Sequence, residues 1–175
     1  MQAIGIAARQ GTRMGPLTDG RPKPLLPVAG KPIREHVLDA AAPYVDGYVV
    51  VVGYEGDQIR ARVGDTYQGF LVEYVEQADQ LGTAHAVGQA EPFVDEDALV
   101  LNGDVYVTDA LVERLATQPG TMAVMSVENP RSYGVVELDG ERVTGIEEQP
   151  LPELAKSQFI NAGVYTFDPS IFATR

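Results

Sequence analysis

Short apolar segments alternate with segments of helical periodicity through the first part of the chain. Strands are predicted for the apolar runs at residues 2–8, 47–53, 69–75 and 98–101. Helices are predicted where apolar residues recur at helical spacing, at residues 31–44, 56–63, 83–90 and 109–117. Strands that alternate with helices form mostly parallel sheets covered on both faces. This pattern therefore limits the chain to the α/β class.

The second part of the chain departs from this alternation. A strand is predicted at 122–127, strands at 134–138 and 142–147 flank the hairpin-type turn Asp139-Gly140, and a last strand is predicted at 159–167. We therefore predict a Rossmann-like three-layer α/β/α fold with a mostly parallel central sheet and a β-hairpin insertion in its second half. In the helix at 31–44 the apolar face is predicted to be Ile33, Val37, Leu38 and Ala41, with Pro32 in the first turn.

Length and composition exclude several classes. A chain of 175 residues is long enough for one domain with its own core and too short for two full ones, so we expect a single domain over 1–175. No apolar run approaches the length of a membrane span, and the N-terminus lacks the basic region of a signal peptide. The absence of cysteine excludes disulfides, thiolate metal sites and a cysteine nucleophile. The expected location is the cytoplasm.

The charge balance is strongly acidic. Twenty-five acidic residues against 13 basic ones give a net charge of −12, and the only lysines are Lys23, Lys31 and Lys156. An acidic field repels phosphates, so nucleic acid is not an expected partner. An acid-rich, lysine-poor surface is typical of a halophilic protein, because concentrated salt screens its self-repulsion.

A loop rich in glycine and proline follows the first predicted strand. In the run ARQGTRMGPLTDGRPKPLLPV, Gly11 and Thr12 can turn the chain so that backbone amides face a phosphate, and Arg13 offers a planar fork for phosphate oxygens. Lys23 stands between two prolines that restrict the backbone and can aim its ammonium group. From composition alone, an ordinary solvated loop with surface bases is an equal alternative.

A second polar segment, Asn102-Gly103-Asp104, follows the strand predicted at 98–101. A carboxylate at the end of a strand suits Mg²⁺, which prefers oxygen ligands, although aspartate also caps turns. Ligands of open α/β sheets bind beyond the carboxyl ends of the strands. We therefore expect this segment to converge with the loop that contains Lys23.

The runs GTRMGPLT and RPKPLLPVAGKP resemble the N-terminal signature of the sugar-1-phosphate nucleotidylyltransferases, and the resemblance extends from Met1 to about Phe172. It implies an enzyme that transfers a nucleoside monophosphate from UTP or dTTP to a sugar 1-phosphate, releasing pyrophosphate and forming a nucleotide sugar. It also implies Mg²⁺ as cofactor and a nucleotidyltransferase domain as the single domain of residues 1–175.

The resemblance also implies residue roles. Arg13 matches the arginine near the departing pyrophosphate, Lys23 the lysine beside the reacting phosphate, and Asp104 the metal ligand. The positions implied to bind the nucleotide are Ile6, Ala7, Ala8, Arg9, Gly11, Thr12, Gln77, Gly82, Thr83, Asn102 and Gly103. Those implied to bind the sugar phosphate are Gly134, Glu148 and Asn161. His36 and His85 are expected to be structural or incidental.

The chain departs from the family pattern at several places. Arg9 stands where the family usually has glycine, and Gln149 stands where some members have lysine. The family's second metal ligand lies further along than this chain extends, so we expect a domain that lacks its C-terminal part. Such a domain should bind nucleotide better than it turns over, and apolar surface exposed after Phe172 would favour homo-oligomers.

Two other functions are compatible with parts of this pattern. A nucleotide-sugar binding or regulatory module with the same fold and little turnover is favoured by the missing second ligand and opposed by Arg13, Lys23 and Asp104. A dinucleotide-dependent oxidoreductase shares the parallel sheet but needs Gly-x-Gly-x-x-Gly after the first strand. The loop has only Gly11 and Gly15, so this class is disfavoured.

The acidic composition generates a prediction about salt. Because counter-ions screen like charges over a few ångströms at molar concentration, the midpoint of thermal unfolding should rise between low and molar KCl. Calorimetry across a KCl series measures it, with equal concentrations of sucrose as a control for general solute effects. A midpoint that stays level in KCl contradicts adaptation to high salt.

Overall fold

The structure, a computed structural model, describes residues 1–9, 11–151 and 153–174, and the side chains of Arg13 and Thr174 also lie outside the description. The chain divides into two compact units. Unit 1 comprises Met1–Thr121 and Tyr165–Arg175, and unit 2 comprises Met122–Val164. Each unit is described by itself, and the single nucleotidyltransferase domain over 1–175 stays a prediction.

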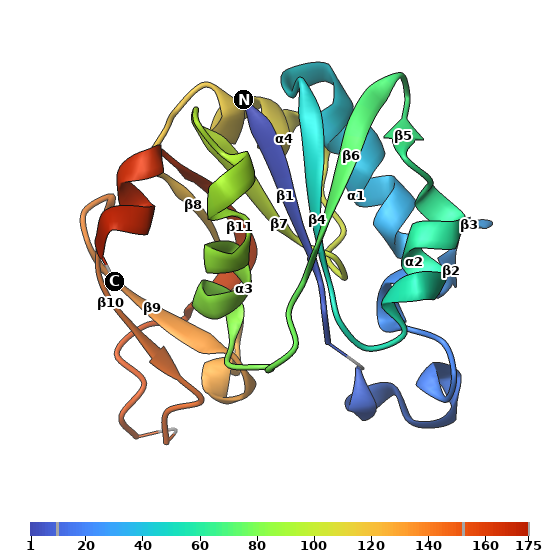
Figure 1. The fold of residues 1–175 in the computed structure, drawn as a ribbon. Coiled ribbons are helices and arrows are strands. Elements are labelled where there is room, and N and C mark those ends of the chain that lie inside the picture. The colour runs from blue at the N-terminus through green and yellow to red at the C-terminus, as the bar shows by residue number, and fades with distance from the viewer. Residues whose placement is uncertain (10, 152, 175) are drawn as a thin grey trace. The chain divides into compact units, whose positions relative to one another are not determined.

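Parallel strands form the sheet of unit 1 (Figure 1). β1 (Gln2–Ala7) lies between β4 (Gly47–Val52) and β7 (Ala98–Asn102), and β6 (Phe70–Glu76) pairs with the other edge of β4; all of these pairings are parallel. A short strand, β5 (Thr66–Tyr67), pairs antiparallel with β6. The predicted strands are therefore present, and the sheet is mixed but mostly parallel.

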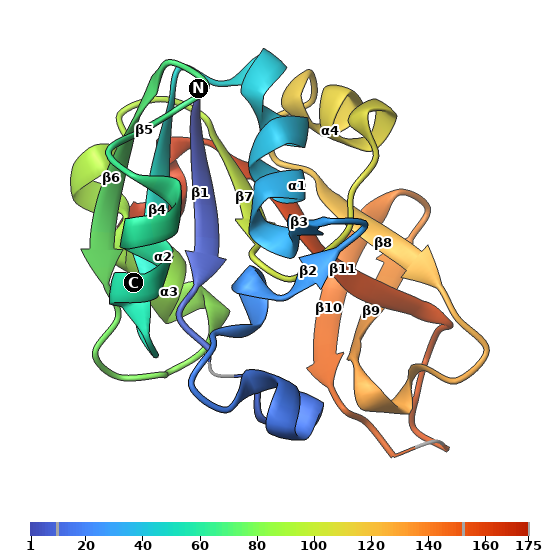
Figure 2. The same cartoon turned by 90° about the vertical axis from the view of Figure 1, so that its right-hand side faces the viewer.

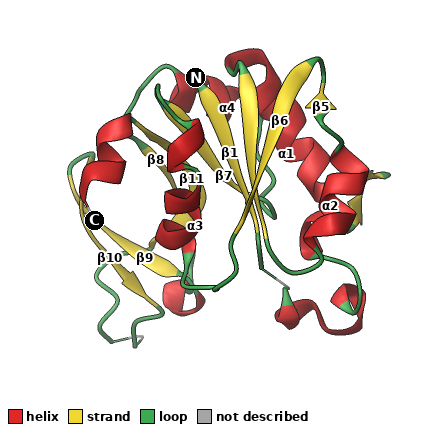
Figure 3. Cartoon of the chain, viewed as in Figure 1, coloured by secondary structure: helices red, strands yellow, loops and turns green. Residues whose placement is uncertain are grey.

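Helices cover both faces of this sheet, which confirms the predicted α/β class. α1 (Ile33–Ala41), α2 (Gly56–Val63) and α4 (Asp109–Ala116) lie on one face, and α3 (Thr83–Gln89) lies on the other (Figures 1 and 2). Burial from both sides explains why β4 reads GYVVVV with every residue buried instead of alternating with polar residues. Figure 3 shows these elements by type.

Short 3₁₀ segments connect the regular elements. They are η1 (Thr12–Thr18), η2 (Lys23–Leu25), η3 (Ala42–Tyr44), η4 (Glu91–Phe93), η5 (Pro130–Ser132) and η6 (Pro169–Thr174). Among the described residues, none of the helices has the length and apolar character that crossing a membrane requires.

The start of α1 differs from the prediction. Pro32 has extended dihedrals (φ −52°, ψ 140°) and belongs to β3 (Lys31–Pro32), which pairs antiparallel with β2 (Pro27–Val28). The helix begins only at Ile33, so the placement of Pro32 in the first helical turn is wrong. The pairing of β3 with β2 holds the chain extended through Pro32 and delays the helix by two residues.

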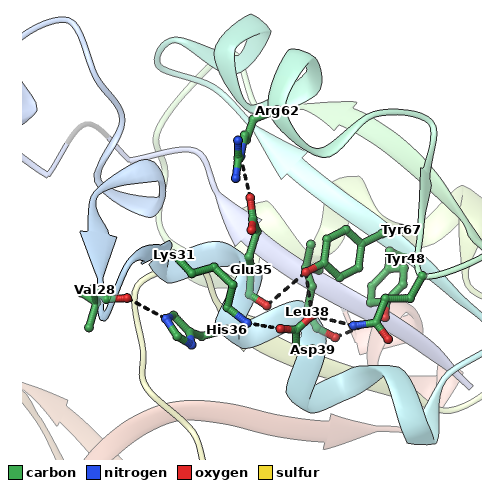
Figure 4. A network of polar contacts seen from close by, with 10 residues as sticks. Val28, Lys31, Glu35, His36, Leu38, Asp39, Tyr48, Arg62 and Tyr67 are labelled. Carbon is green, nitrogen blue, oxygen red and sulfur yellow. Dashed lines mark hydrogen bonds and ion pairs between the residues drawn. The ribbon is translucent and has the colours of Figure 1, made fainter.

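A carboxylate on α1 collects polar contacts from neighbouring segments (Figure 4). Asp39 pairs with Lys31 and accepts hydrogen bonds from the Tyr67 hydroxyl (2.7 Å) and the Gln68 amide (2.6 Å). Burial opposes ionisation of Asp39, but the hydrogen bonds from these three groups outweigh it and lower the pKa of the carboxyl. The charged Asp39 therefore ties α1 to β3, to β5 and to the residue that follows β5.

Other contacts fix α1 against the loop before it and against α2. The His36 ring contacts the Val28 carbonyl oxygen through Nε2 (2.8 Å), and Arg62 donates to Glu35 (2.6 Å). His36, which was expected to be structural or incidental, thus has a structural contact. The β2–β3 hairpin that follows Lys23 is held to a helix that is itself packed on the sheet.

Antiparallel strands make up unit 2. β9 (Gly134–Asp139) lies between β10 (Arg142–Glu148) and β11 (Phe159–Phe167), and β8 (Met122–Ser126) also pairs with β11, whose last residues belong to unit 1. The predicted hairpin insertion is confirmed. Because Asp139 pairs with Arg142, its central turn residues are Gly140 and Glu141, one position later than predicted.

The two ends of unit 2 join unit 1 at a hydrogen-bonded clamp formed by unit 1 residues. The Thr166 amide donates to the Thr121 carbonyl (2.8 Å), and the Gly120 amide donates to the Thr166 carbonyl (3.1 Å). The hydroxyl of Thr166, whose side chain is fully buried, donates to the Gln118 carbonyl (2.9 Å). Residues 122–164 are therefore an insertion with adjacent ends.

Candidate functional site

Gly11 shapes the loop that leaves β1. It adopts a left-handed conformation (φ 79°, ψ 38°), and a Cβ there would lie 2.7 Å from Cβ of Lys23. Both features require glycine. The buried Thr18 hydroxyl lies within hydrogen-bond distance of the Gly11 and Gly15 carbonyls, at 3.1 Å each, so η1 folds back on the start of the loop. Sequence reasoning missed this role of Thr18.

Two features position Lys23: its close packing against Gly11 and the proline on each side of it. Pro22 is extended and Pro24 is buried, which leaves the lysine backbone little freedom. The Lys23 ammonium forms an ion pair with Oδ2 of Asp104 at 2.6 Å. The two side chains are 28% and 39% exposed, so the pair is open to solvent. The structure therefore brings together a lysine and a carboxylate that are 81 positions apart in the chain.

The turn Asn102-Gly103-Asp104 continues the pairing of β1 with β7. The Gly103 amide donates to the Ile6 carbonyl at 2.7 Å, and a Cβ at Gly103 would lie 2.5 Å from that oxygen. Only glycine permits this approach of the two backbones. Because β1 and β7 are parallel, their carboxyl ends meet at one edge of the sheet (Figure 1), and Asp104 lies exposed just beyond it.

The residues at the end of β1 are mostly inaccessible through their side chains. Ala7 and Ala8 are buried, and the Ala8 carbonyl accepts from the Tyr54 amide (3.1 Å) and the Gln80 side chain (3.3 Å). Any ligand contact at these alanines must come from the backbone. Ile6 is half-buried, and Arg9 and Thr12 are exposed. The side chain of Arg13 lies outside the described part of the chain.

Gln77 lies deeper than its proposed role suggests. Its side chain is 4% exposed, and Nε2 donates to the Gly82 carbonyl (3.2 Å) and contacts Nδ1 of His85 (2.8 Å). Gly82 and Thr83 open α3, which carries His85. The imidazole therefore fixes the glutamine amide and leaves Oε1 as the group that can face a ligand. His85 was expected to be structural or incidental, and the structure shows that it contacts the amide of Gln77.

The residues implied to bind a sugar phosphate lie in unit 2. Gly134 and Glu148 are cross-strand partners, and a Cβ at Gly134 would lie 2.9 Å from Oε1 of Glu148. The Glu148 side chain therefore lies over Gly134. Asn161 is on β11, and its Oδ1 accepts from the Gly163 amide (2.9 Å). The sheet of unit 2 thus carries all three residues on neighbouring strands.

Asp104 supplies the carboxylate that suits a metal ion. Within residues 1–9, 11–151 and 153–174, no group of three or more histidine, aspartate or glutamate side chains is arranged to hold a metal. One exposed carboxylate fits Mg²⁺ when phosphate oxygens and water complete the coordination. The oxygen-only chemistry of the turn is thus compatible with Mg²⁺ held together with a phosphate ligand.

The chain is similar to known proteins over almost its whole length. The family model described as nucleotidyl transferase matches residues 3–175. The bifunctional protein GlmU of Methanococcus maripaludis strain C5 is 41% identical over 173 residues, which cover 98% of this chain and 41% of that protein. The chain thus spans less than half the length of this relative.

Two further relatives are similar over more of their length. The UTP–glucose-1-phosphate uridylyltransferase AglF of Haloferax volcanii is 36% identical, with 98% of this chain and 74% of that protein covered. A crystal structure of a candidate glucose-1-phosphate thymidylyltransferase from Bacillus anthracis, in complex with a sucrose, has a TM-score of 0.83 at 27% identity. The match covers 99% of this chain and 73% of that chain.

The contact between Gly11 and Lys23 generates a prediction. Gly20 has a left-handed backbone (φ 69°), and a Cβ added there would have no atom within 4 Å. Gly20→Ala should therefore lower the free energy of unfolding only by the backbone strain, about 1–2 kcal/mol. Gly11→Ala should cost about 1–3 kcal/mol more, because the added methyl overlaps Lys23. Chemical denaturation measures both variants. Equal losses would show that Gly11 is needed for its backbone conformation alone.

Proposed function

Because the chain belongs to the nucleotidyl transferase family, whose model matches residues 3–175, we propose that it transfers a nucleoside monophosphate from UTP or dTTP to a sugar 1-phosphate. Pyrophosphate is released and a nucleotide sugar is formed. The observation that carries the proposal is the solvent-open ion pair of Lys23 and Asp104 beyond the carboxyl ends of β1 and β7. Open α/β sheets bind their ligands at this edge.

The names of the relatives support the substrate class. The Haloferax relative is named for UTP and glucose 1-phosphate, and the Bacillus structure is named for thymidylyl transfer to glucose 1-phosphate. We choose UTP over dTTP as the donor, although one methyl group in a pocket separates two ligands by only about 1–3 kcal/mol.

The reaction is a direct in-line displacement. An oxygen of the sugar 1-phosphate forms a bond to the α-phosphorus of the triphosphate, and the bond from that phosphorus to the oxygen bridging to the β-phosphorus breaks. The electron pair leaves with pyrophosphate, and no protein nucleophile takes part. The protein accelerates the reaction by positioning the two substrates and by compensating the negative charge of the phosphates.

Lys23 and Asp104 change partners in this scheme. Before substrate binds, the two charges neutralise each other at 2.6 Å. A bound triphosphate draws the Lys23 ammonium to the α-phosphate and frees the carboxylate to act as metal ligand. Mg²⁺ held there with the phosphates would neutralise part of their negative charge. Arg13 is assigned to the leaving pyrophosphate.

The remaining roles follow the division into units. Ile6, Ala7, Ala8, Arg9, Gly11, Thr12, Gln77, Gly82, Thr83, Asn102 and Gly103 are assigned to the nucleotide and all belong to unit 1. Gly134, Glu148 and Asn161 are assigned to the sugar phosphate and belong to unit 2. A cytoplasmic location, homo-oligomer formation and adaptation to high salt stay predictions.

A nucleotide-sugar binding or regulatory module is the second candidate. It is favoured by the lack, among the described residues, of a carboxylate and histidine cluster around Asp104. Such a module would bind UTP and the nucleotide sugar without releasing pyrophosphate, so an assay of turnover separates the two candidates.

Substitution of Lys23 tests the proposed activity. In Lys23→Ala, pyrophosphate release from UTP and glucose 1-phosphate or N-acetylglucosamine 1-phosphate should fall roughly a hundred- to a thousand-fold, because a donor aimed at transition-state charge is lost. The matched control is Lys156→Ala, which removes an exposed lysine paired with Glu137. A loss below about threefold in Lys23→Ala would place Lys23 away from the reacting phosphate.

The buried Gln77 generates a prediction about the base. Its free Oε1 can accept the N3–H of uracil or thymine, so UTP and dTTP should bind more tightly than ATP or GTP in calorimetric titrations with Mg²⁺. Gln77→Met should reduce this preference, whereas Gln118→Met, a change at an exposed glutamine, should keep it. If purine triphosphates bind the wild-type chain as tightly as UTP, the assignment of Gln77 is wrong.

A further inference from the structure

Arg34 on α1 is a buried cation that the proposed reaction does not use. Its side chain is completely buried, and it is the largest of the fully buried side chains in the described part of the molecule. Arginine is almost never fully buried unless it is paired. Among the described residues, Nε and Nη1 have no hydrogen-bond partner, and Nη2 donates only to the Gly5 carbonyl, at 3.3 Å.

Glycines make the space for the guanidinium group. A Cβ at Gly5, in the middle of β1, would collide with Nη2, and a Cβ at Gly103 would lie 3.0 Å from Nη1. Gly103 is the residue between Asn102 and Asp104 in the turn after β7. The guanidinium therefore lies against the buried side of the same turn that presents Asp104 to solvent on its other side.

The charge on Arg34 is kept at an energetic cost. Desolvation lowers the pKa of the guanidinium to about 10, and the nearby Tyr74 opposes that shift. Tyr74 has its own pKa raised, first by burial, so it is neutral near pH 7 and offers no counter-charge. The side chain is therefore protonated, and no carboxylate within the described residues forms an ion pair with it. An uncompensated buried charge destabilises a fold unless something else balances it.

We propose that Arg34 is a positioning residue for the triphosphate: it supports the Gly103–Asp104 turn from behind and supplies a positive charge that the bound phosphates compensate. This inference rests on the proposed function. In a dry interior a charge acts over a longer distance than at the surface, because little water screens it. The triphosphate remains anionic with one Mg²⁺ bound, so the charge favours the complex. It also offsets locally the net charge of −12 that repels phosphates.

Replacement by methionine tests the charge. Arg34→Met keeps an unbranched chain but removes the buried cation, so the midpoint of thermal unfolding should rise. Affinity for UTP with Mg²⁺, measured by calorimetry, should fall about tenfold, the size expected of one unit charge acting over roughly 10 Å at an effective dielectric of 20. Arg114→Met, which removes the same charge from an exposed position on α4, is the matched control and should change the affinity less than about twofold.

Replacement by lysine separates charge from shape. A buried lysine loses its proton at a much lower pH than an exposed one. The ratio of the Arg34→Lys affinity to the wild-type affinity should therefore fall as the pH rises from about 6 to about 9, toward the ratio measured for Arg34→Met. Wild-type Arg34 stays charged between these values, and the ratio cancels the titration of UTP itself.

The outcomes distinguish the inference from the proposed function. Arg34→Met that binds UTP as tightly as wild type overturns the inference alone. If Arg34→Met unfolds or loses stability together with affinity, and the affinity of Arg34→Lys does not change with pH, then Arg34 has only a packing role. This result also overturns the inference. A wild-type chain that binds neither UTP nor dTTP overturns the proposed function, and this inference with it.

Discussion

The hydrogen bond from the Gly103 amide to the Ile6 carbonyl joins the ends of β1 and β7, and the candidate site depends on it. It holds the turn after β7 beside the loop that leaves β1, so that Asp104 meets Lys23. The same glycine leaves room for Arg34 on the opposite side of the turn. Gly103 therefore fixes the positions of three charged groups: the exposed carboxylate of Asp104, the Lys23 ammonium paired with it, and the buried guanidinium of Arg34.

Much of the fold follows from residue patterns that burial dictates. The alternation of strands with helices predicted a sheet covered on both faces, and every residue of β4 is buried. Gly140 marked the hairpin of unit 2, although the turn lies one position later than expected. The convergence of Lys23 with Asp104 followed from a topological rule alone, because parallel strands end at one edge of a sheet. Such features are local or topological, so one sequence suffices to predict them.

Contacts between distant side chains could not be predicted in this way. Nothing in the spacing of Gln77 and His85 shows that the ring fixes the amide, because that contact depends on how α3 leaves its loop. The burial of Arg34 did have a signal: it stands three, four and seven positions before Val37, Leu38 and Ala41, which places it on the apolar face of α1. Because arginine is charged, its position on the apolar face did not predict burial. Ile33, which was expected on this face, is only half-buried.

The clamp between Thr121 and Thr166 has a consequence for how such a protein changes over time. A segment whose ends are fixed next to each other can be lengthened, shortened or exchanged with little penalty, because the entropy of loop closure grows only with the logarithm of length. Residues 122–164 form such a segment and carry the positions assigned to the acceptor sugar. The segment proposed to bind the acceptor sugar is thus free to diverge faster than the rest of the chain, so that one ancestral scaffold can give rise to proteins that share the fold of unit 1 and differ in this segment.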